Sequence, residues 1–194
     1  MAHYPEQIAQ AESGSSQGNE RVELYDLNCQ GHVGIVAGLL DTFHKAFAPS
    51  KDKNQQFLDI GCGSGRLTAE CLLPHCPPCR RLVAVDKSSA MLKFAAKNYP
   101  HTKIVYLVLD IVQDVEEFKR EQGQFQRVYS FLTLHWMRDQ HRCLSNIERL
   151  MAPGGECFLF FKRSVHFFAL FEAMISSQRW SKYSQDLRRF LHLI

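Results

Sequence analysis

Three glycines with a regular spacing, Gly61, Gly63 and Gly65, lie between an apolar run and a helical segment. Glycines at such a turn allow a tight reversal of the chain, and their missing Cβ atoms let a ligand lie directly against the backbone. A helix that follows the turn presents free backbone N–H groups to that ligand. Residues 58–65 therefore predict a cofactor-binding turn, which also contains Cys62.

An acidic residue follows at the end of the next apolar run. Asp86 comes 21 residues after Gly65, and a carboxylate at this place can accept hydrogen bonds from both hydroxyls of a ribose. Taken alone, the turn could be a tight strand–helix connection, with Asp86 as an ordinary helix N-cap. The two features in this order favour a site for a cofactor that carries a nucleoside.

The charges beside the glycines separate two classes of such cofactors. A dinucleotide-binding turn has glycine at its first, third and sixth positions, whereas the sixth position here is Arg66. Asp59 lies two residues before the first glycine. A carboxylate there would repel a pyrophosphate but attract the ammonium and sulfonium groups of S-adenosylmethionine. We therefore predict S-adenosylmethionine as the cofactor and disfavour an NAD-dependent oxidoreductase.

Short apolar runs alternate with helical segments around this turn. The predicted strands are residues 57–60, 82–85, 104–109, 125–132 and 156–161, and the predicted helices are residues 22–47, 66–73, 90–98, 112–120 and 142–151. Alternation of this kind is typical of βαβ units. We therefore expect an α/β fold with a Rossmann-like parallel sheet and helices on both faces. Pro74 should end the second helix, and residues 153–155, Pro-Gly-Gly, should form a turn before the last strand.

The chain is expected to form one domain. Residues 1–20 are polar and predict a disordered tail, because they cannot bury enough apolar surface to offset the entropy of ordering them. Residues 21–194 would form the domain, with its core at residues 57–162. One more helical pattern follows residue 161, and no pair of strands is predicted after it.

Residues 57–162 resemble the class I S-adenosylmethionine-dependent methyltransferases. Residues 58–65 look like the family's first motif, residues 83–88 with Met91 like its second, and residues 150–155 like the turn before its fifth strand. Asp110 is similar to the acidic residue that caps the adenine amino group. The cofactor-binding residues that we predict are Asp59, Gly61, Cys62, Gly63, Gly65, Asp86, Lys87, Met91, Asp110 and Ile111.

A narrower resemblance is to the juvenile hormone acid O-methyltransferases of arthropods and the related plant carboxyl methyltransferases. It is carried by Tyr25, Asn28 and Gln30 and by the Leu-His-Trp sequence at residues 134–136. The resemblance implies that Gln30 and Trp136 hold the carboxylate of the acceptor. The alternatives are a surface position for Gln30 and core packing for Trp136.

A carboxylic acid acceptor needs no general base, because it is already ionised at neutral pH. Catalysis would come from holding the two reactants in line and excluding water. His135 could act as a base for a hydroxyl or amine acceptor, or could pack beside the rim of the pocket. We predict methyl ester formation on a lipophilic acid of the juvenile hormone acid or farnesoic acid type.

The C-terminal part departs from the family pattern. The family fold has seven strands, whereas only five are predicted here, so that one side of the sheet would be exposed and part of the acceptor pocket missing. A non-catalytic S-adenosylmethionine-binding or interaction module, a truncated methyltransferase, is therefore the alternative function.

Composition excludes several other classes. The formal net charge of +3, with scattered basic residues, argues against nucleic-acid binding. No apolar run reaches the roughly 20 residues that cross a bilayer, and no secretory signal is evident, so a cytoplasmic protein with reduced cysteines is expected. Cys76 and Cys79 flank two prolines without a second close pair, so no metal is predicted. The expected partner is a small-molecule acceptor, and the oligomeric state stays open.

Overall fold

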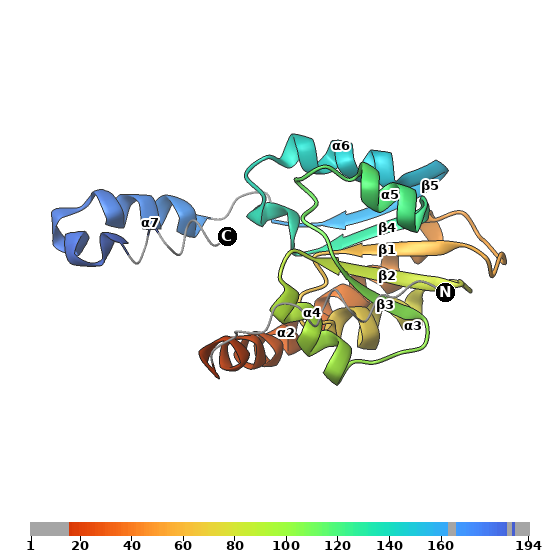
Figure 1. Ribbon diagram of the computed structural model, residues 1–194, viewed down its shortest axis with the longest axis horizontal. Coiled ribbons are helices and arrows are strands. Elements are labelled where there is room, and N and C mark those ends of the chain that lie inside the picture. The colour runs from red at the N-terminus through yellow and green to blue at the C-terminus, as the bar shows by residue number, and fades with distance from the viewer. Residues whose placement is uncertain (1–15, 163–165, 186–187, 189–194) are drawn as a thin grey trace.

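A five-stranded parallel sheet forms the centre of the computed structural model, which describes residues 16–162, 166–185 and 188 (Figure 1). The strands are β1 Gln56–Ile60, β2 Arg81–Asp86, β3 Ile104–Val108, β4 Phe125–Phe131 and β5 Met151–Phe160. Their order in the sheet is β3-β2-β1-β4-β5, and every pairing is parallel. The predicted fold class is thus confirmed. The order reverses between β1 and β4, and ligands of open α/β sheets bind at such a point.

Helices cover both faces of the sheet, because alternate residues of each strand point to opposite sides. On one face, strand residues such as Leu58 and Val83 pack against α6 Gln140–Leu150 and the region of α5 Glu116–Gln122. On the other face, Phe57 and its neighbours pack against two helices, α2 Ser16–Phe43 and α4 Ser89–Asn98. Figure 1 shows α5 and α6 on one side of the strands and α2, α3 and α4 on the other.

The N-terminal helix, α2 Ser16–Phe43, is longer than predicted at its start and shorter at its end. It begins before the expected Val22, so residues 16–20 of the predicted tail are helical, because extending an existing helix costs far less than starting one. Residues 1–15 lie outside the described residues. At the other end, a 3-10 turn, η1 His44–Ala46, takes the place of the last predicted helical turn.

The helix after the glycines continues past the proline that was expected to end it. A π turn, η2 Thr68–Leu72, leads into α3 Leu73–His75, which contains Pro74. A proline ring crowds the carbonyl four residues earlier and has no N–H to give it. The wider π turn directly before Pro74 relieves this conflict, so the prediction of a helix end at Pro74 was wrong.

Three further boundaries differ from the prediction. Residues 153–155 form an irregular part of β5 rather than a turn before it, because Met151 already pairs with Phe125 and the next paired residues are Arg127 and Glu156. Helix α5 begins at Glu116 instead of residue 112. The Asp110 and Asp114 side chains accept the N–H groups of the residues two positions later, which favours turns over a continuous helix there. Helix α4 Ser89–Asn98 begins one residue before the prediction.

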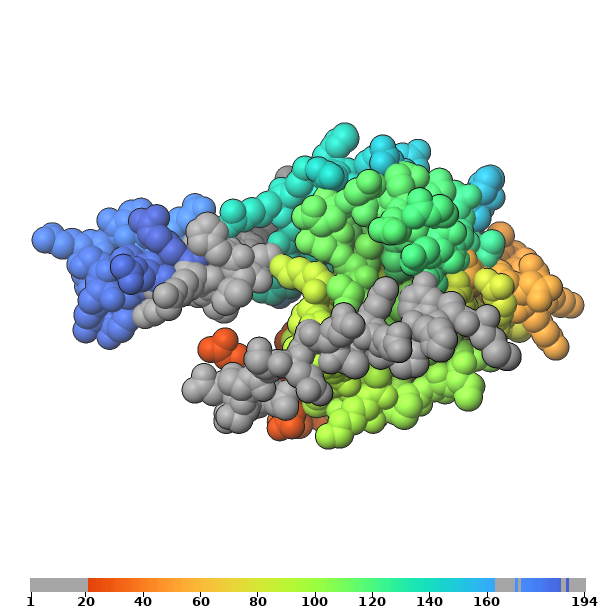
Figure 2. All heavy atoms as spheres, in the orientation of Figure 1, coloured from red at the N-terminus to blue at the C-terminus, as the bar shows by residue number. Residues whose placement is uncertain are grey.

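The part of the chain after β5 lies apart from the sheet. Helix α7 His166–Ser176 and the 3-10 segment η4 Gln178–Tyr183 form a separate lobe in Figures 1 and 2. No strand follows β5 within residues 166–185, so the described chain has five strands of the seven expected for the family fold. Among the helices that the structure describes, none combines the length and apolar character required to cross a bilayer.

A strained turn connects β4 to the segment that follows it. Leu132 has a φ of 55°, the one positive φ at a non-glycine residue in the described chain. Its N–H donates to the Phe160 carbonyl at 2.6 Å, and the Thr133 hydroxyl donates to the Gly61 carbonyl at 3.2 Å. These bonds hold the turn, which redirects the chain from the sheet into a 3-10 turn, η3 Leu134–Trp136. A left-handed leucine costs about 1–2 kcal/mol.

Replacing Leu132 with glycine and with alanine should reverse the usual order of stability. At an ordinary position alanine is more stabilising than glycine by about 0.5–1 kcal/mol. At Leu132 we expect the Gly variant to have a free energy of unfolding about 1 kcal/mol above that of the Ala variant, since only alanine keeps the backbone strain. Urea unfolding measures this difference. The same pair of substitutions at Leu144, an exposed residue of α6, is the control and should keep the usual order. A more stable Ala variant at position 132 would show that the turn is unstrained.

Candidate functional site

A cavity of about 400 Å³ opens at the carboxyl ends of the central strands, where the strand order reverses. Its lining is formed by Tyr25, Ile60, Gly61, Gly63, Asp86, Lys87, Ser88, Met91, Leu109, Asp110, Ile111, Leu132, Thr133, Trp136 and Met137. Eight of these belong to the predicted cofactor or acceptor residues: Gly61, Gly63, Asp86, Lys87, Met91, Asp110, Ile111 and Trp136. The structure therefore brings these eight residues together from the ends of four strands, β1, β2, β3 and β4.

The glycine turn is tied to the neighbouring strand and leaves its backbone open to the cavity. The N–H groups of Gly61 and Cys62 donate to the Val85 carbonyl at 2.8 and 3.0 Å. Gly63 has a φ of 55°, and a Cβ there would lie 3.0 Å from the Tyr25 ring. A Cβ on Gly61 would collide with the Thr133 side chain. The glycine turn therefore requires glycine at positions 61 and 63.

The third glycine, Gly65, packs closely against helix α4. A Cβ on Gly65 would lie 2.7 Å from the Cβ of Ala95 on α4 and 2.9 Å from the Tyr106 hydroxyl. Gly65 does not line the cavity. It permits close packing between the segment after the turn and α4, which fixes the direction in which the following helix leaves.

Asp86 links the glycine turn to helix α4. One carboxylate oxygen accepts the Gly63 N–H at 3.0 Å, and the other accepts the Ser88 N–H at 2.9 Å. Ser88 is the N-cap of α4, since its hydroxyl accepts the Met91 N–H. The alternative in which Asp86 is an ordinary N-cap is therefore wrong. Burial raises the pKa of Asp86, and the bonds from the Ser88 and Gly63 backbones oppose this rise.

Asp59 lies behind the glycine turn rather than in the larger cavity. It lines a smaller adjoining cavity, to which Cys62 also contributes. The Thr68 hydroxyl donates to its carboxylate at 2.6 Å. Burial raises the pKa of Asp59 to about 7, the Thr68 bond lowers it, and the charge of Asp86 raises it further. The carboxyl is therefore poised to gain or lose a proton near neutral pH.

The loop after β3 supplies a second carboxylate to the larger cavity. Asp110 and Ile111 line the cavity together with Met91 of α4. The loop is anchored by α6, on the face of the sheet opposite α4. The Asn146 amide of α6 donates to the carbonyls of Ile111 and Gln113, each at 2.7 Å. Two carboxylates, from the ends of β2 and β3, thus border one space.

The three predicted acceptor residues are separated by the structure. Trp136 lines the larger cavity. His135 is buried behind it, with ring centroids 5.0 Å apart, and lines neither cavity. Its Nδ1 is the one buried side-chain nitrogen or oxygen in the described chain without a hydrogen-bond partner, and burial, with the charge of Lys162, lowers the pKa of the ring. Gln30 is exposed on α2 and also lines neither cavity.

Three residues line both cavities: Tyr25, Gly61 and Leu132. Of these, Tyr25 was noted only for its resemblance and Leu132 was not singled out. On α2, Tyr25 lines the cavities and Gln30 does not, although both residues flank the same buried face of the helix. Its buried positions include Val22, Asp26 and Cys29, so Gln30 lies next to this face but points outward. No local pattern signals the left-handed turn at Leu132.

Comparison with known proteins agrees with this geometry. The family model described as "Methyltransferase domain" matches residues 58–159. Juvenile hormone acid O-methyltransferase of Drosophila melanogaster is 33% identical over 156 residues, 79% of this chain and 52% of that protein. The protein of the same name from Bombyx mori is 33% identical over 142 residues, 73% of this chain and 50% of that protein. The chain thus spans about half the length of these curated relatives.

A solved structure shares the fold. The crystal structure of a SAM-dependent methyltransferase from Anabaena variabilis superposes with a TM-score of 0.56 at 21% identity, over 73% of this chain and 56% of that one. The family match and the two relatives confirm the predicted family. The chain belongs to the methyltransferase domain family.

Proposed function

We propose that this chain carries the cofactor site and part of the acceptor pocket of an O-methyltransferase that methylates a small lipophilic carboxylic acid. One observation carries the proposal: a single cavity joins the glycine turn and the carboxylates of Asp86 and Asp110 to an apolar region around Trp136. S-adenosylmethionine is the cofactor, and when bound it supplies a methyl group on a positively charged sulfur.

The residues around the cavity fit the parts of this cofactor. Asp86 would accept hydrogen bonds from the ribose hydroxyls, and Asp110 would accept one from the adenine amino group. The side chains of Met91, Leu109 and Ile111 provide apolar surface for the flat base. Backbone at Gly61 and Gly63 forms the floor, at the two places where a Cβ would meet Thr133 and Tyr25.

Asp59 would serve the cationic end of the cofactor from behind the turn. A positive charge nearby favours the ionised form of a carboxyl and lowers its pKa. Without that charge, the buried Asp59 has a pKa of about 7 and is held by Thr68. Binding of a cation would therefore draw a proton off Asp59.

The acceptor region needs to position and shield a reactant rather than take a proton from it. A carboxylic acid with a pKa of about 4 is already an anion at neutral pH. Trp136, Leu132 and Met137 form an apolar wall that excludes water, which favours in-line displacement between held reactants. His135 packs beside Trp136 and lines neither cavity, so it is placed for packing rather than for proton transfer.

The names of the two insect relatives support this acceptor class, since both are juvenile hormone acid O-methyltransferases. The test is direct. Incubation of the chain with methyl-labelled cofactor and juvenile hormone acid or farnesoic acid should give a labelled methyl ester, and Trp136→Ala should lower its yield at limiting acid. Cofactor binding without any ester across a panel of acids would instead favour the alternative, a non-catalytic binding module.

Removing the Asp86 carboxylate should weaken the cofactor site. We expect Asp86→Ala to cost about 1–3 kcal/mol of binding free energy for S-adenosylhomocysteine, because the ribose hydroxyls and the Gly63 N–H lose an acceptor. Titration calorimetry measures this loss. The matched control is Asp114→Ala, which removes an exposed carboxylate whose bond is to the nearby Glu116 N–H. Unchanged affinity in Asp86→Ala would mean that the site is assigned wrongly.

Asp59 should make the stability of the ligand-free chain depend on pH in an unusual direction. Its pKa rises from 3.8 to about 7 on folding. Between these values the folded state holds a proton that the unfolded state has lost, so the free energy of unfolding should fall as pH rises from about 4 to 7. Urea unfolding at several pH values measures the slope. Asp59→Asn, which keeps an acceptor for Thr68, should reduce that slope, and an identical slope would contradict the raised pKa.

A further inference from the structure

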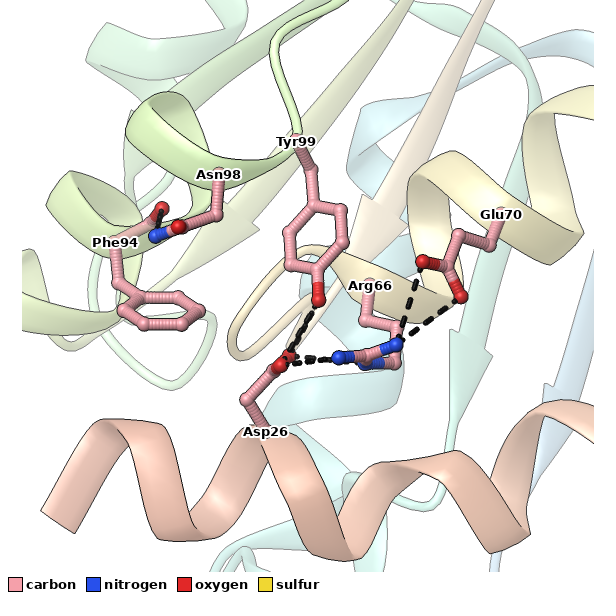
Figure 3. Close-up of polar contacts among 6 residues, drawn as sticks. All are labelled: Asp26, Arg66, Glu70, Phe94, Asn98 and Tyr99. Carbon is pink, nitrogen blue, oxygen red and sulfur yellow. Dashed lines mark hydrogen bonds and ion pairs between the residues drawn. The ribbon is translucent and has the colours of Figure 1, made fainter.

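A polar cluster outside the cavity joins α2 to the glycine turn (Figure 3). The Arg66 guanidinium donates to both carboxylate oxygens of Asp26, at 2.6 Å from Nη2 and 3.2 Å from Nε. The Tyr99 hydroxyl, at the end of α4, lies 2.9 and 3.0 Å from the same two oxygens. One carboxylate on α2 thus receives side chains from two other elements. We call Asp26, Arg66 and Tyr99 the α2 clasp.

The clasp is shielded from water and electrostatically satisfied. The side chain of Asp26 is 7% exposed and that of Arg66 is 16% exposed. Burial alone would raise the pKa of Asp26, but hydrogen bonds from Arg66, Ser64 and Tyr99 outweigh it and lower the pKa. Ser64 lies in the glycine turn, so the clasp contacts the turn directly. The Arg66 guanidinium also lies over the Tyr99 ring, 5.3 Å from its centroid.

The clasp sets the direction of a residue that lines both cavities. Tyr25 precedes Asp26 on α2, and successive helical residues point about 100° apart. Fixing Asp26 therefore fixes the direction of Tyr25. The Tyr25 ring packs over the glycine turn, 3.0 Å from the Cβ position of Gly63. Without a fixed α2, this wall of both cavities would lose its position.

The two halves of α2 are held in different ways. Its members of the apolar cluster on this face of the sheet all lie in the C-terminal half: Val33, Val36, Ala37 and Leu40. The N-terminal half buries only Val22 and Cys29 among its apolar side chains from residue 21 on, and it exposes Leu24 and Leu27 and part of Tyr25. Between the halves, Gly31 and Gly34 weaken the helix relative to alanine. The polar contacts of Asp26, beside the buried side chains of Val22 and Cys29, therefore help to hold the half that carries Tyr25.

We propose that the α2 clasp is a positioning device for the cofactor: it holds the N-terminal half of α2 against the glycine turn so that Tyr25 closes the wall shared by both cavities. This inference rests on the proposed cofactor site. Asp26, Arg66 and Tyr99 lie outside the cavity and act through Tyr25. The clasp thus links cofactor affinity to a helix that lies outside residues 58–159.

A double-mutant cycle on cofactor binding tests the proposal. Titration calorimetry with S-adenosylhomocysteine would compare the starting chain with Asp26→Asn, Tyr25→Ala and the double variant, each shown to be folded by its thermal transition. We expect Asp26→Asn to raise the Kd roughly tenfold, which corresponds to about 1.4 kcal/mol of coupling. In the Tyr25→Ala background the same change should leave the Kd nearly unaltered, because the wall that the clasp positions is gone.

Two further variants make the result decisive. Tyr99→Phe removes one hydroxyl and keeps the ring, so it replaces Asp26→Asn in the same cycle if the buried Arg66 charge prevents that variant from folding. Glu70→Gln is the control. Glu70 also pairs with Arg66, at 3.4 Å, but its side chain is 46% exposed. The Kd of this variant for S-adenosylhomocysteine should stay unchanged. Equal losses with and without Tyr25, or no loss at all, would overturn the clasp inference alone. A starting chain that does not bind S-adenosylhomocysteine would instead contradict the proposed function.

Discussion

Two backbone N–H groups converge on the carboxylate of Asp86, and the proposed cofactor site depends on this contact. One comes from Gly63 in the glycine turn and the other from Ser88, at the start of α4. The carboxylate stands at the end of β2, next to the strand that feeds the turn. Because burial opposes its charge, the two donors make an ionised Asp86 tolerable at this place. A single side chain thereby orders the turn, the strand end and the helix that border the cavity.

Around this contact, the site combines two kinds of structure. The strand ends and the turns of residues 58–159 provide the two carboxylates, the glycine floor and Trp136. Helix α2 lies before that segment and provides Tyr25. The first part is held by the hydrogen bonds of a parallel sheet. Helix α2 is held by the contact of Asp26 with Arg66, 40 residues later in the sequence. The wall formed by the strand ends and the wall formed by Tyr25 are therefore stabilised by different interactions.

The sequence predicts well what depends on neighbouring residues. The order of strands and helices follows from apolar runs bounded by turn residues, and Gly61, Gly63 and Asp86 are recognised because their spacing itself is the signal. Their convergence on one cavity agrees with that reading. Features that depend on distant contacts were missed. Gln30 and Tyr25 are close on α2, and the contact of Asp26 with the distant Arg66 holds the side of the helix on which Tyr25 lines the cavity. The left-handed turn at Leu132 is held by a hydrogen bond to Phe160, which is distant in the sequence. Pro74 is accommodated by a π turn, which no residue pattern in that segment predicts.

Because of Asp59, occupancy of the proposed site should depend on pH as well as on the concentration of the cofactor. A carboxyl with a pKa of about 7 carries its proton for much of the time at neutral pH, and a cationic ligand must displace that proton to gain the full attraction of the charge. Protons and the positively charged cofactor therefore compete for one buried carboxyl group, which does not line the larger cavity. The heat of binding would then include the ionisation heat of the buffer, and a fall in pH would weaken binding with no change in the shape of the cavity.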